Sequence, residues 1–172
     1  TGDWSQQGTT TGRETNTFAT FWFDHGVKPS GTGYEYVLLP GRNAEQTAAY
    51  AAAPDVEILQ SDSRIHAARD KKDGVVAANF WEDGGSVAGI TVDKAASVVL
   101  KSQGDALELA VAEPNQNNGT VVVTLATSGS VRSKDGNVTV LQTEPFIKLS
   151  VDTQGKGGGT SRVSIQADQA EK

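Results

Sequence analysis

The sequence predicts an all-β protein with two antiparallel parts: a portion of a β-sandwich that carries one short helix, and then a small β-sandwich. Runs rich in Val, Ile, Thr and aromatic residues recur along the 172 residues, separated by clusters of Gly, Asn and Asp, as strands are separated by turns. Ten of the eleven aromatic residues precede residue 82, and only Phe146 follows it. We therefore place a change-over between Asp83 and Ala96 and divide the chain into residues 1–92 and 93–172.

The first part contains six runs with the composition of strands. Two of the connections between them, at residues 70–74 and 82–85, are short and contain Gly. Residues 65–92 are therefore expected to form a three-stranded antiparallel meander. The six expected strands are residues 18–23, 34–39, 56–60, 65–69, 75–81 and 87–92.

One segment, residues 43–53, has helical character. Asn43 can cap the first turn through its side-chain oxygen, and Gln46 stands three residues later, in the position of a capping box. Pro54 stops propagation of the helix. Since the apolar residues of this segment are mostly Ala, we expect the helix to lie close against a sheet edge or face.

The second part repeats the strand pattern with aliphatic residues in place of aromatic ones. Turn residues such as Gly104, Gly119 and Gly136 separate the runs at regular intervals, which is typical of a small antiparallel sandwich. The six expected strands are residues 97–101, 106–112, 121–126, 137–142, 146–151 and 161–166.

Composition excludes several classes of function. The chain has 15 Lys and Arg against 21 Asp and Glu, a net charge of −6, which disfavours nucleic acid as a partner. No apolar run approaches the about 20 residues that cross a bilayer, so no membrane partner is expected. The absence of Cys removes disulfides, zinc ribbons and thiol nucleophiles, and leaves the compartment undecided. Because residue 1 is Thr and Met is absent, we expect a mature secreted chain or a piece of a longer one.

Few residues suggest catalysis or metal binding. His25, between Asp24 and Gly26, is the most reaction-like, but adjacent strand residues point to opposite faces, so Asp24 and His25 cannot form a relay. A turn bracketed by Asp24 is the favoured interpretation. His66 alternates with apolar Ile65 and Ala67 and is expected on the opposite face. Two His and no Cys make a transition-metal site improbable, and calcium at the Asp and Asn turns stays open without a twelve-residue ligand loop.

Trp22 and Trp81 are candidates for carbohydrate binding, because an indole offers a broad apolar face to a sugar ring. Each lies at the end of an apolar run, so packing in the core is the favoured interpretation. The Gly-rich segment 155–160 fails the spacing of a phosphate-binding loop and precedes a strand-like run, which indicates a hairpin. We expect no cofactor and no bound metal.

Four segments, in order, resemble polysaccharide lyase family 8, the family of bacterial hyaluronate, chondroitin AC and xanthan lyases. They are an aromatic run ending in Asp-His-Gly at 18–26, a Tyr-x-Tyr-x-Leu-x-Pro run at 34–40, the segment 47–59 and the Ala-Ala-Asn-Phe-Trp run at 77–81. The resemblance implies that residues 1–92 end the large lyase β-sandwich. It implies more loosely that 93–172 form the small C-terminal β-domain. There the chain has Glu113-Pro114-Asn115-Gln116 where an Asp-Pro-Thr-like turn is expected.

The resemblance implies a secreted, extracellular enzyme, hyaluronate lyase (hyaluronidase)-like, that degrades uronate-containing polysaccharide by β-elimination. The Asn, His, Tyr and Arg that act in this family belong to an N-terminal α/α-toroid absent from this sequence, and His25 does not match the family's base. The resemblance therefore implies no catalytic residue in this chain. The expected partners are this toroid, the remaining β-sandwich and a polysaccharide of hyaluronan or chondroitin type. The chain is expected to brace the toroid and to shape the substrate cleft, with Trp22, His25 and Trp81 as candidate substrate-binding residues.

Two other functions stay open. The chain can be an independent carbohydrate-binding or adhesion module that uses Trp22, Trp81 or Trp4 as a stacking platform. It can also be a scaffold that binds only its own parent chain.

Overall fold

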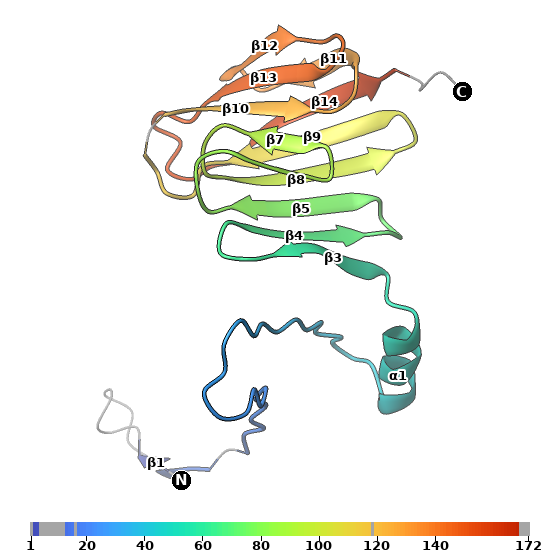
Figure 1. Cartoon of the computed structure of the whole chain (residues 1–172), viewed down its shortest axis with the longest axis vertical. Coiled ribbons are helices and arrows are strands. Elements are labelled where there is room, and N and C mark those ends of the chain that lie inside the picture. The colour runs from blue at the N-terminus through green and yellow to red at the C-terminus, as the bar shows by residue number, and fades with distance from the viewer. Residues whose placement is uncertain (1, 4–12, 16, 118, 169–172) are drawn as a thin grey trace. The chain divides into compact units, whose positions relative to one another are not determined.

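The computed structural model describes residues 2–3, 13–15, 17–117 and 119–168. The backbone divides into two compact units, Thr1–Leu38 and Leu39–Lys172. The larger unit contains the helix and every strand from β3 to β14 (Figure 1). Its two antiparallel sheets confirm the predicted all-β class with one short helix.

The smaller unit differs from the prediction. Its described strands are β1 (Gly2–Asp3) and β2 (Arg13–Glu14), which pair antiparallel. The strands expected at 18–23 and 34–39 are absent, and that prediction is wrong for the described chain. A strand needs a hydrogen-bonded neighbour, and no described segment pairs with either of these two.

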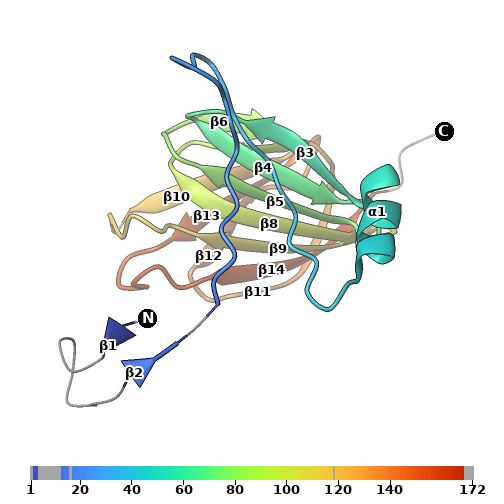
Figure 2. The same cartoon turned by 90° about the horizontal axis from the view of Figure 1, so that it is seen from below.

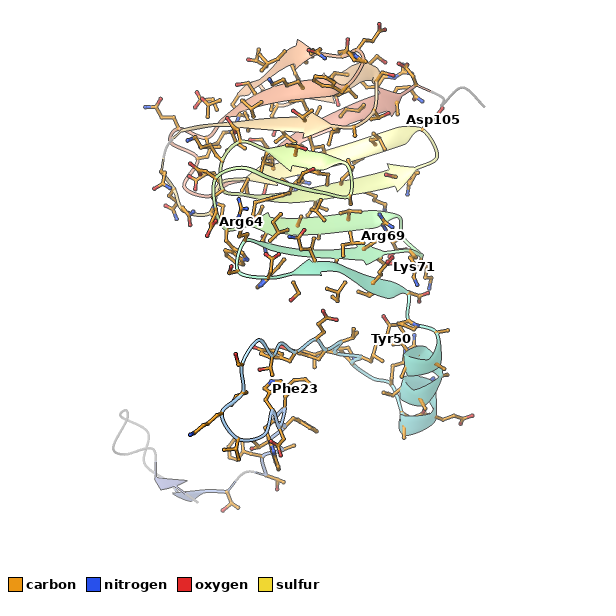
Figure 3. All side chains as sticks on the ribbon, in the orientation of Figure 1. Phe23, Tyr50, Arg64, Arg69, Lys71 and Asp105 are labelled. Carbon is orange, nitrogen blue, oxygen red and sulfur yellow. The ribbon has the colours of Figure 1, made fainter. Side chains whose placement is uncertain are left out.

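Helix α1 (Ala44–Ala52) forms as its capping residues predict. Gln46 N–H donates to Asn43 Oδ1 at 2.9 Å, and Asn43 N–H donates to Gln46 Oε1 at 3.1 Å, so the capping box is complete. The helix covers no sheet, contrary to expectation, because it buries no residue and only Tyr50 is half-buried. The Tyr50 hydroxyl accepts a hydrogen bond from Val56 N–H at 3.4 Å (Figure 3).

The sandwich consists of a seven-stranded and a five-stranded sheet, antiparallel throughout, and the order of the larger can be followed in Figure 2. The larger sheet runs in the order β11 (Gly129–Lys134), β14 (Ser161–Ala167), β9 (Ala106–Ala112), β8 (Ala96–Gln103), β5 (Val75–Phe80), β4 (Ile65–Asp70) and β3 (Val56–Ser61). The smaller sheet runs in the order β12 (Val138–Gln142), β13 (Ile147–Asp152), β10 (Thr120–Leu125), β7 (Ile90–Val92) and β6 (Gly85–Val87).

The structure does not divide at residue 92, so the predicted boundary between 1–92 and 93–172 is corrected. Both sheets cross it: β5 pairs with β8, Phe80 opposite Ala96, and β7 pairs with β10, Val92 opposite Val123. Seven of the ten aromatic residues before residue 82 belong to the unit Thr1–Leu38, so the change from aromatic to aliphatic residues largely follows the division between the two units.

The predicted three-stranded meander is also corrected. Residues 87–92 do not form one strand, because Ala88 and Gly89 both have positive φ, 51° and 78°, and make a two-residue turn between β6 and β7. This hairpin joins the five-stranded sheet, so the chain crosses from one sheet to the other after β5. Strand β11 was not predicted, since Val131 is its only large apolar residue.

The core lies between the two sheets, and alternation along β9, β10, β13 and β14 places buried side chains there. In β5, likewise, Ala78 and Phe80 are buried and Ala77 is exposed. The largest fully buried side chains are Phe80, Ile90, Leu109, Leu125, Ile147, Leu149 and Ile165.

Candidate functional site

The smaller unit presents a group of exposed rings. Phe23 stacks on Tyr34 with ring centroids 5.1 Å apart, and Tyr34 stacks on Tyr36 at 6.3 Å (Figure 3). His25 lies parallel to Phe23 at 6.5 Å. Each of the three carbon rings is more than half exposed. The group therefore offers aromatic faces to solvent.

The Asp24 carboxylate belongs to the turn, as favoured from the sequence. Gly26 N–H donates to Asp24 Oδ1 at 2.8 Å, and Gly26 adopts a φ of 74°, which glycine reaches without strain. His25 stacks on the Phe23 ring, whereas the Asp24 carboxylate accepts a hydrogen bond from the backbone. The side chains of Asp24 and His25 therefore have different partners.

The predicted core packing of Trp22 and Trp81 is wrong for the described chain. Trp22 is 80% exposed and Trp81 is 50% exposed. The three candidate substrate-binding residues do not share a unit. Trp22 and His25 belong to Thr1–Leu38, and Trp81 belongs to Leu39–Lys172. Trp4 lies outside the described residues.

Trp81 stands at the end of β5 among polar side chains. Its backbone N–H donates to the Arg64 carbonyl at 2.9 Å, and its ring meets His66 edge to face at 5.5 Å. Phe80 and Ile65 are buried, so Trp81 and His66, one residue further along each strand, lie on the outer face of the sheet. The predicted outward orientation of His66 is confirmed.

Two polar contacts extend this outer surface. Asn79, opposite His66 in the register, accepts a hydrogen bond from the Ser97 hydroxyl at 2.7 Å. Arg64 Nε donates to Glu82 Oε2 at 3.0 Å, and both side chains are 59% exposed. Such an exposed ion pair adds little stability.

A pocket of about 290 Å³ lies where the turn after β5, the β7–β8 connection and the β9–β10 loop meet. We call it the Glu113 pocket; its lining includes Asp83, Lys94, Glu113, Asn117, Thr120 and Val121. Sequence reasoning treated Glu113 only as part of a turn. The available signal was its spacing, because Glu113 continues the alternation of Leu109 and Val111 and so falls on their face of the strand.

Glu113 is buried, with 6% of its surface exposed. Its Oε2 accepts a hydrogen bond from Asn117 N–H at 2.6 Å, which ties the β9–β10 loop together. Its Oε1 is also buried and has no hydrogen-bond partner among the described residues. A buried acceptor without a partner is unfavourable and calls for an explanation.

Lys94 and Asp83 form the charged rim of this pocket. Lys94 Nζ donates to Asp83 Oδ2 at 3.0 Å, and Ala95 N–H donates to Asp83 Oδ1 at 3.1 Å. These hydrogen bonds, Lys94 first, lower the pKa of Asp83, and the bond to Asp83 raises the pKa of Lys94.

The lowered pKa of Asp83 predicts a pH-dependent stability. The carboxylate is favoured in the folded state, so its contribution is present above the ordinary Asp pKa and is lost as the pH falls below about 4. The difference in free energy of unfolding between the native chain and Asp83→Asn, from urea titrations, should shrink over that range. The substitution should have a smaller effect in a Lys94→Met background, and an equal effect there would contradict the pairing.

The part of the chain that the structure describes offers no group of three or more His, Cys, Asp or Glu placed to hold a metal ion. Within the same residues, no helix is long and apolar enough to span a membrane.

Two family models match consecutive segments. The super-sandwich domain of polysaccharide lyase family 8 matches residues 1–51, and the C-terminal β-sandwich domain of that family matches residues 57–122. The first match ends within α1 and the second begins within β3. The second match also crosses residue 92, in agreement with the sheets.

Curated relatives and solved structures agree with these matches. The chain is 40% identical to a xanthan lyase of Bacillus sp. (strain GL1) over 96% of its length, and 29% identical to the hyaluronate lyase HylB of Enterococcus faecalis over 87%. It spans only 19% and 15% of these two proteins. A Streptomyces coelicolor chondroitin AC lyase structure matches 97% of the chain, and the chain covers 23% of that structure, with a TM-score of 0.84 and 30% identity.

Proposed function

This chain belongs to polysaccharide lyase family 8, and we propose that it is the C-terminal β-region of a secreted, extracellular bacterial enzyme that degrades uronate-containing polysaccharide by β-elimination. The observation that carries the proposal is the pair of consecutive matches, from super-sandwich to C-terminal sandwich, within one short chain. The relatives named above act, by their names, on xanthan, hyaluronate and chondroitin. Polysaccharide of this uronate-containing class is therefore the proposed substrate of the parent enzyme.

In this proposal the chain braces the catalytic toroid and completes one side of the substrate cleft. Phe18, Phe21 and Trp22 are 85%, 91% and 80% exposed, and large apolar side chains clustered at a surface mark an interaction site. Residues 18–23 also have the composition of a strand without a described partner strand. The remaining β-sandwich of the parent enzyme would supply that partner.

The proposal assigns no catalytic residue to this chain. His25 and His66 are its two histidines, and they lie against the aromatic rings of Phe23 and Trp81, respectively. Proton abstraction from a sugar carbon needs a positioned base in a site that binds the substrate. That base would come from the toroid.

Reconstitution tests this function. The 172-residue chain is mixed with the remainder of its parent enzyme, and the unsaturated uronate product released from hyaluronan or xanthan is followed by its absorbance. We expect no turnover by the chain alone and recovery of activity in the mixture. Turnover by the chain alone would contradict the non-catalytic role, and a mixture with no gain would contradict bracing.

A paired substitution sharpens the test. Trp22→Ser should weaken association with the remainder about tenfold or more, because buried aromatic anchors dominate interfaces. The matched control is Leu141→Ser on β12, which removes an apolar side chain that is 52% exposed in the sandwich. Equal losses for both variants would argue against a specific role of residues 18–23.

A second function, carbohydrate binding, is favoured by one observation. The half-exposed indole of Trp81 meets His66 edge to face at 5.5 Å, and Asn79 stands opposite His66 in the register, which combines an apolar platform with polar groups for hydroxyls. Titration with hyaluronan and chondroitin oligosaccharides should change Trp fluorescence in the native chain and in Trp22→Ala, but not in Trp81→Ala. No change at millimolar ligand would count against this function.

A further inference from the structure

The outer face of the seven-stranded sheet carries an apolar band. One residue from each of five neighbouring strands contributes to it, and the five stand in register across the sheet. We call these residues the outer band: Ile58, Ala68, Ala77, Val99 and Ala110. They point away from the core, because Ala78 and Val98 are buried and adjacent residues of a strand face opposite sides. Ile58 and Val99 are each 41% exposed, and Ala77 is also exposed.

The outer face of the five-stranded sheet has a different composition. There a row that crosses all five strands in register consists of polar side chains: Ser86, Thr91, Thr124, Lys148 and Gln142. Polar residues are the usual choice for the solvated face of an antiparallel sheet. The outer band departs from this rule, although the packing of the core does not require apolar residues there. The band is therefore suited to a partner surface better than to water.

Polar side chains flank the outer band on both sides. On one side His66, Asn79 and Ser97 follow one another in the register, and on the other side Lys101 stands opposite Glu108. An apolar centre with a polar rim is the usual anatomy of a protein–protein interface. Because neighbouring strands lie about 4.8 Å apart, five strands make the band about 19 Å long. Its length and its short side chains fit a flat protein surface.

The super-sandwich part of the chain leads directly into the outer band. The match to the super-sandwich domain ends at residue 51, and β3, which supplies Ile58, begins at Val56. A super-sandwich domain is thus tethered at one end of the band, which raises its effective concentration there. The relatives also contain far more chain than this one, which spans 19% of the xanthan lyase and 15% of the hyaluronate lyase. A domain of the parent protein is therefore the nearest occupant.

We propose that the outer band docks against the super-sandwich domain of the parent enzyme, with Val99 as the main anchor. The outer face of the five-stranded sheet then stays in contact with solvent. This inference rests on the proposed function, because it requires a parent enzyme, and it adds which face of the sandwich makes the contact. A second copy of the chain and the chain's own smaller unit are the competing occupants, which the experiment separates.

Thiol labelling tests this docking face, because the native chain contains no Cys. Val99→Cys and the control Thr91→Cys, at an exposed position of β7, are treated with a maleimide, alone and with the remainder of the parent enzyme. The mass of the 172-residue chain reports its label. Both variants should react freely alone. The remainder should slow the labelling of Val99→Cys at least about tenfold, since an interface centre excludes water, and should change that of Thr91→Cys less than about twofold.

A charge substitution gives a second measurement. Val99→Lys should associate with the remainder at least about tenfold more weakly than the native chain, because a buried charge without a partner is unfavourable. The matched control is Val122→Lys, which makes the same exchange on the outer side of β10 in the five-stranded sheet. Its dissociation constant should stay within about twofold of the native value. Circular dichroism checks that both variants fold.

Each outcome decides the matter. Protection of Val99→Cys alone, with weaker association of Val99→Lys, supports the proposal. It is overturned if the remainder slows neither Cys variant or slows both equally. It is also overturned if Val99→Cys is already protected in the chain alone, at all concentrations by the smaller unit or only at high concentration by a second copy. Recovered turnover without protection would overturn the docking face and leave the proposed function standing, whereas protection without turnover would do the reverse.

Discussion

Replacing Phe80 with Ala should lower the free energy of unfolding by about 3–5 kcal/mol. Phe80 is 2% exposed, stands opposite Ile65 and Ala96 in the sheet, and is among the largest fully buried side chains. The packing around it is tight: a methyl group added at Gly85 would lie 2.8 Å from Phe80 Cδ1. The surrounding backbone is fixed by two strand pairings and can close the resulting cavity only in part.

Urea denaturation followed by far-ultraviolet circular dichroism measures this loss, with Leu141→Ala as control. Leu141 lies on β12 and is 52% exposed, so its truncation should cost about 0.5 kcal/mol or less. A loss below about 1 kcal/mol for Phe80→Ala would mean that the ring does not fill the core described here.

Replacing Gly74 with Ala should destabilise the sandwich by about 2–5 kcal/mol, the sum of backbone strain and overpacking. Gly74 ends the turn before β5 with a φ of 64°, a region that L-residues rarely adopt. A Cβ there would also collide with the backbone carbonyl oxygen of Ser102, which cannot move freely because Ser102 N–H donates to the Gly74 carbonyl at 2.8 Å.

Gly104→Ala separates the two causes. Gly104 has the same φ of 64°, but a Cβ added there would meet no atom within 4 Å. This control should cost only the strain of the left-handed conformation, about 1–2 kcal/mol. Equal losses at the two positions would show that the close approach of the Ser102 carbonyl oxygen to Gly74 adds no steric penalty to the substitution.

Local sequence patterns predicted much of the sandwich correctly. Residues 106–112 were expected as a strand and form β9 with those bounds, because Leu107, Leu109 and Val111 alternate cleanly with residues of the outer face. Asn43 and Gln46 predicted the helix start, since a capping box is complete within four residues. These features depend on neighbours in the sequence alone.

Predictions failed where the outcome depended on distant partners. Residues 18–23 have the composition of a strand, but a strand also requires a neighbouring backbone to pair with. No described segment of the chain pairs with these residues. The division at residue 92 failed because composition does not record that β5 pairs with β8 across the hairpin β6–β7. A pairing that skips two strands has no local signal.

The candidate sites show the same difference between features set by neighbouring residues and features set by distant partners. Trp81 was identified from its own chemistry, whereas its contact with His66 depends on the register between β4 and β5. The Glu113 pocket draws on three separate segments, around Asp83, Lys94 and Glu113, and no single one predicts it.

The position of β14 has a consequence for biosynthesis. This strand lies between β9 and β11, and β11 has no other partner in its sheet. Because the ribosome delivers the chain from its N-terminus, β9 and β11 must wait until Ser161–Ala167 has emerged before their edges can be joined. Until then the facing edges of both strands keep unpaired backbone N–H and C=O groups, which are open to other nascent chains and to chaperones.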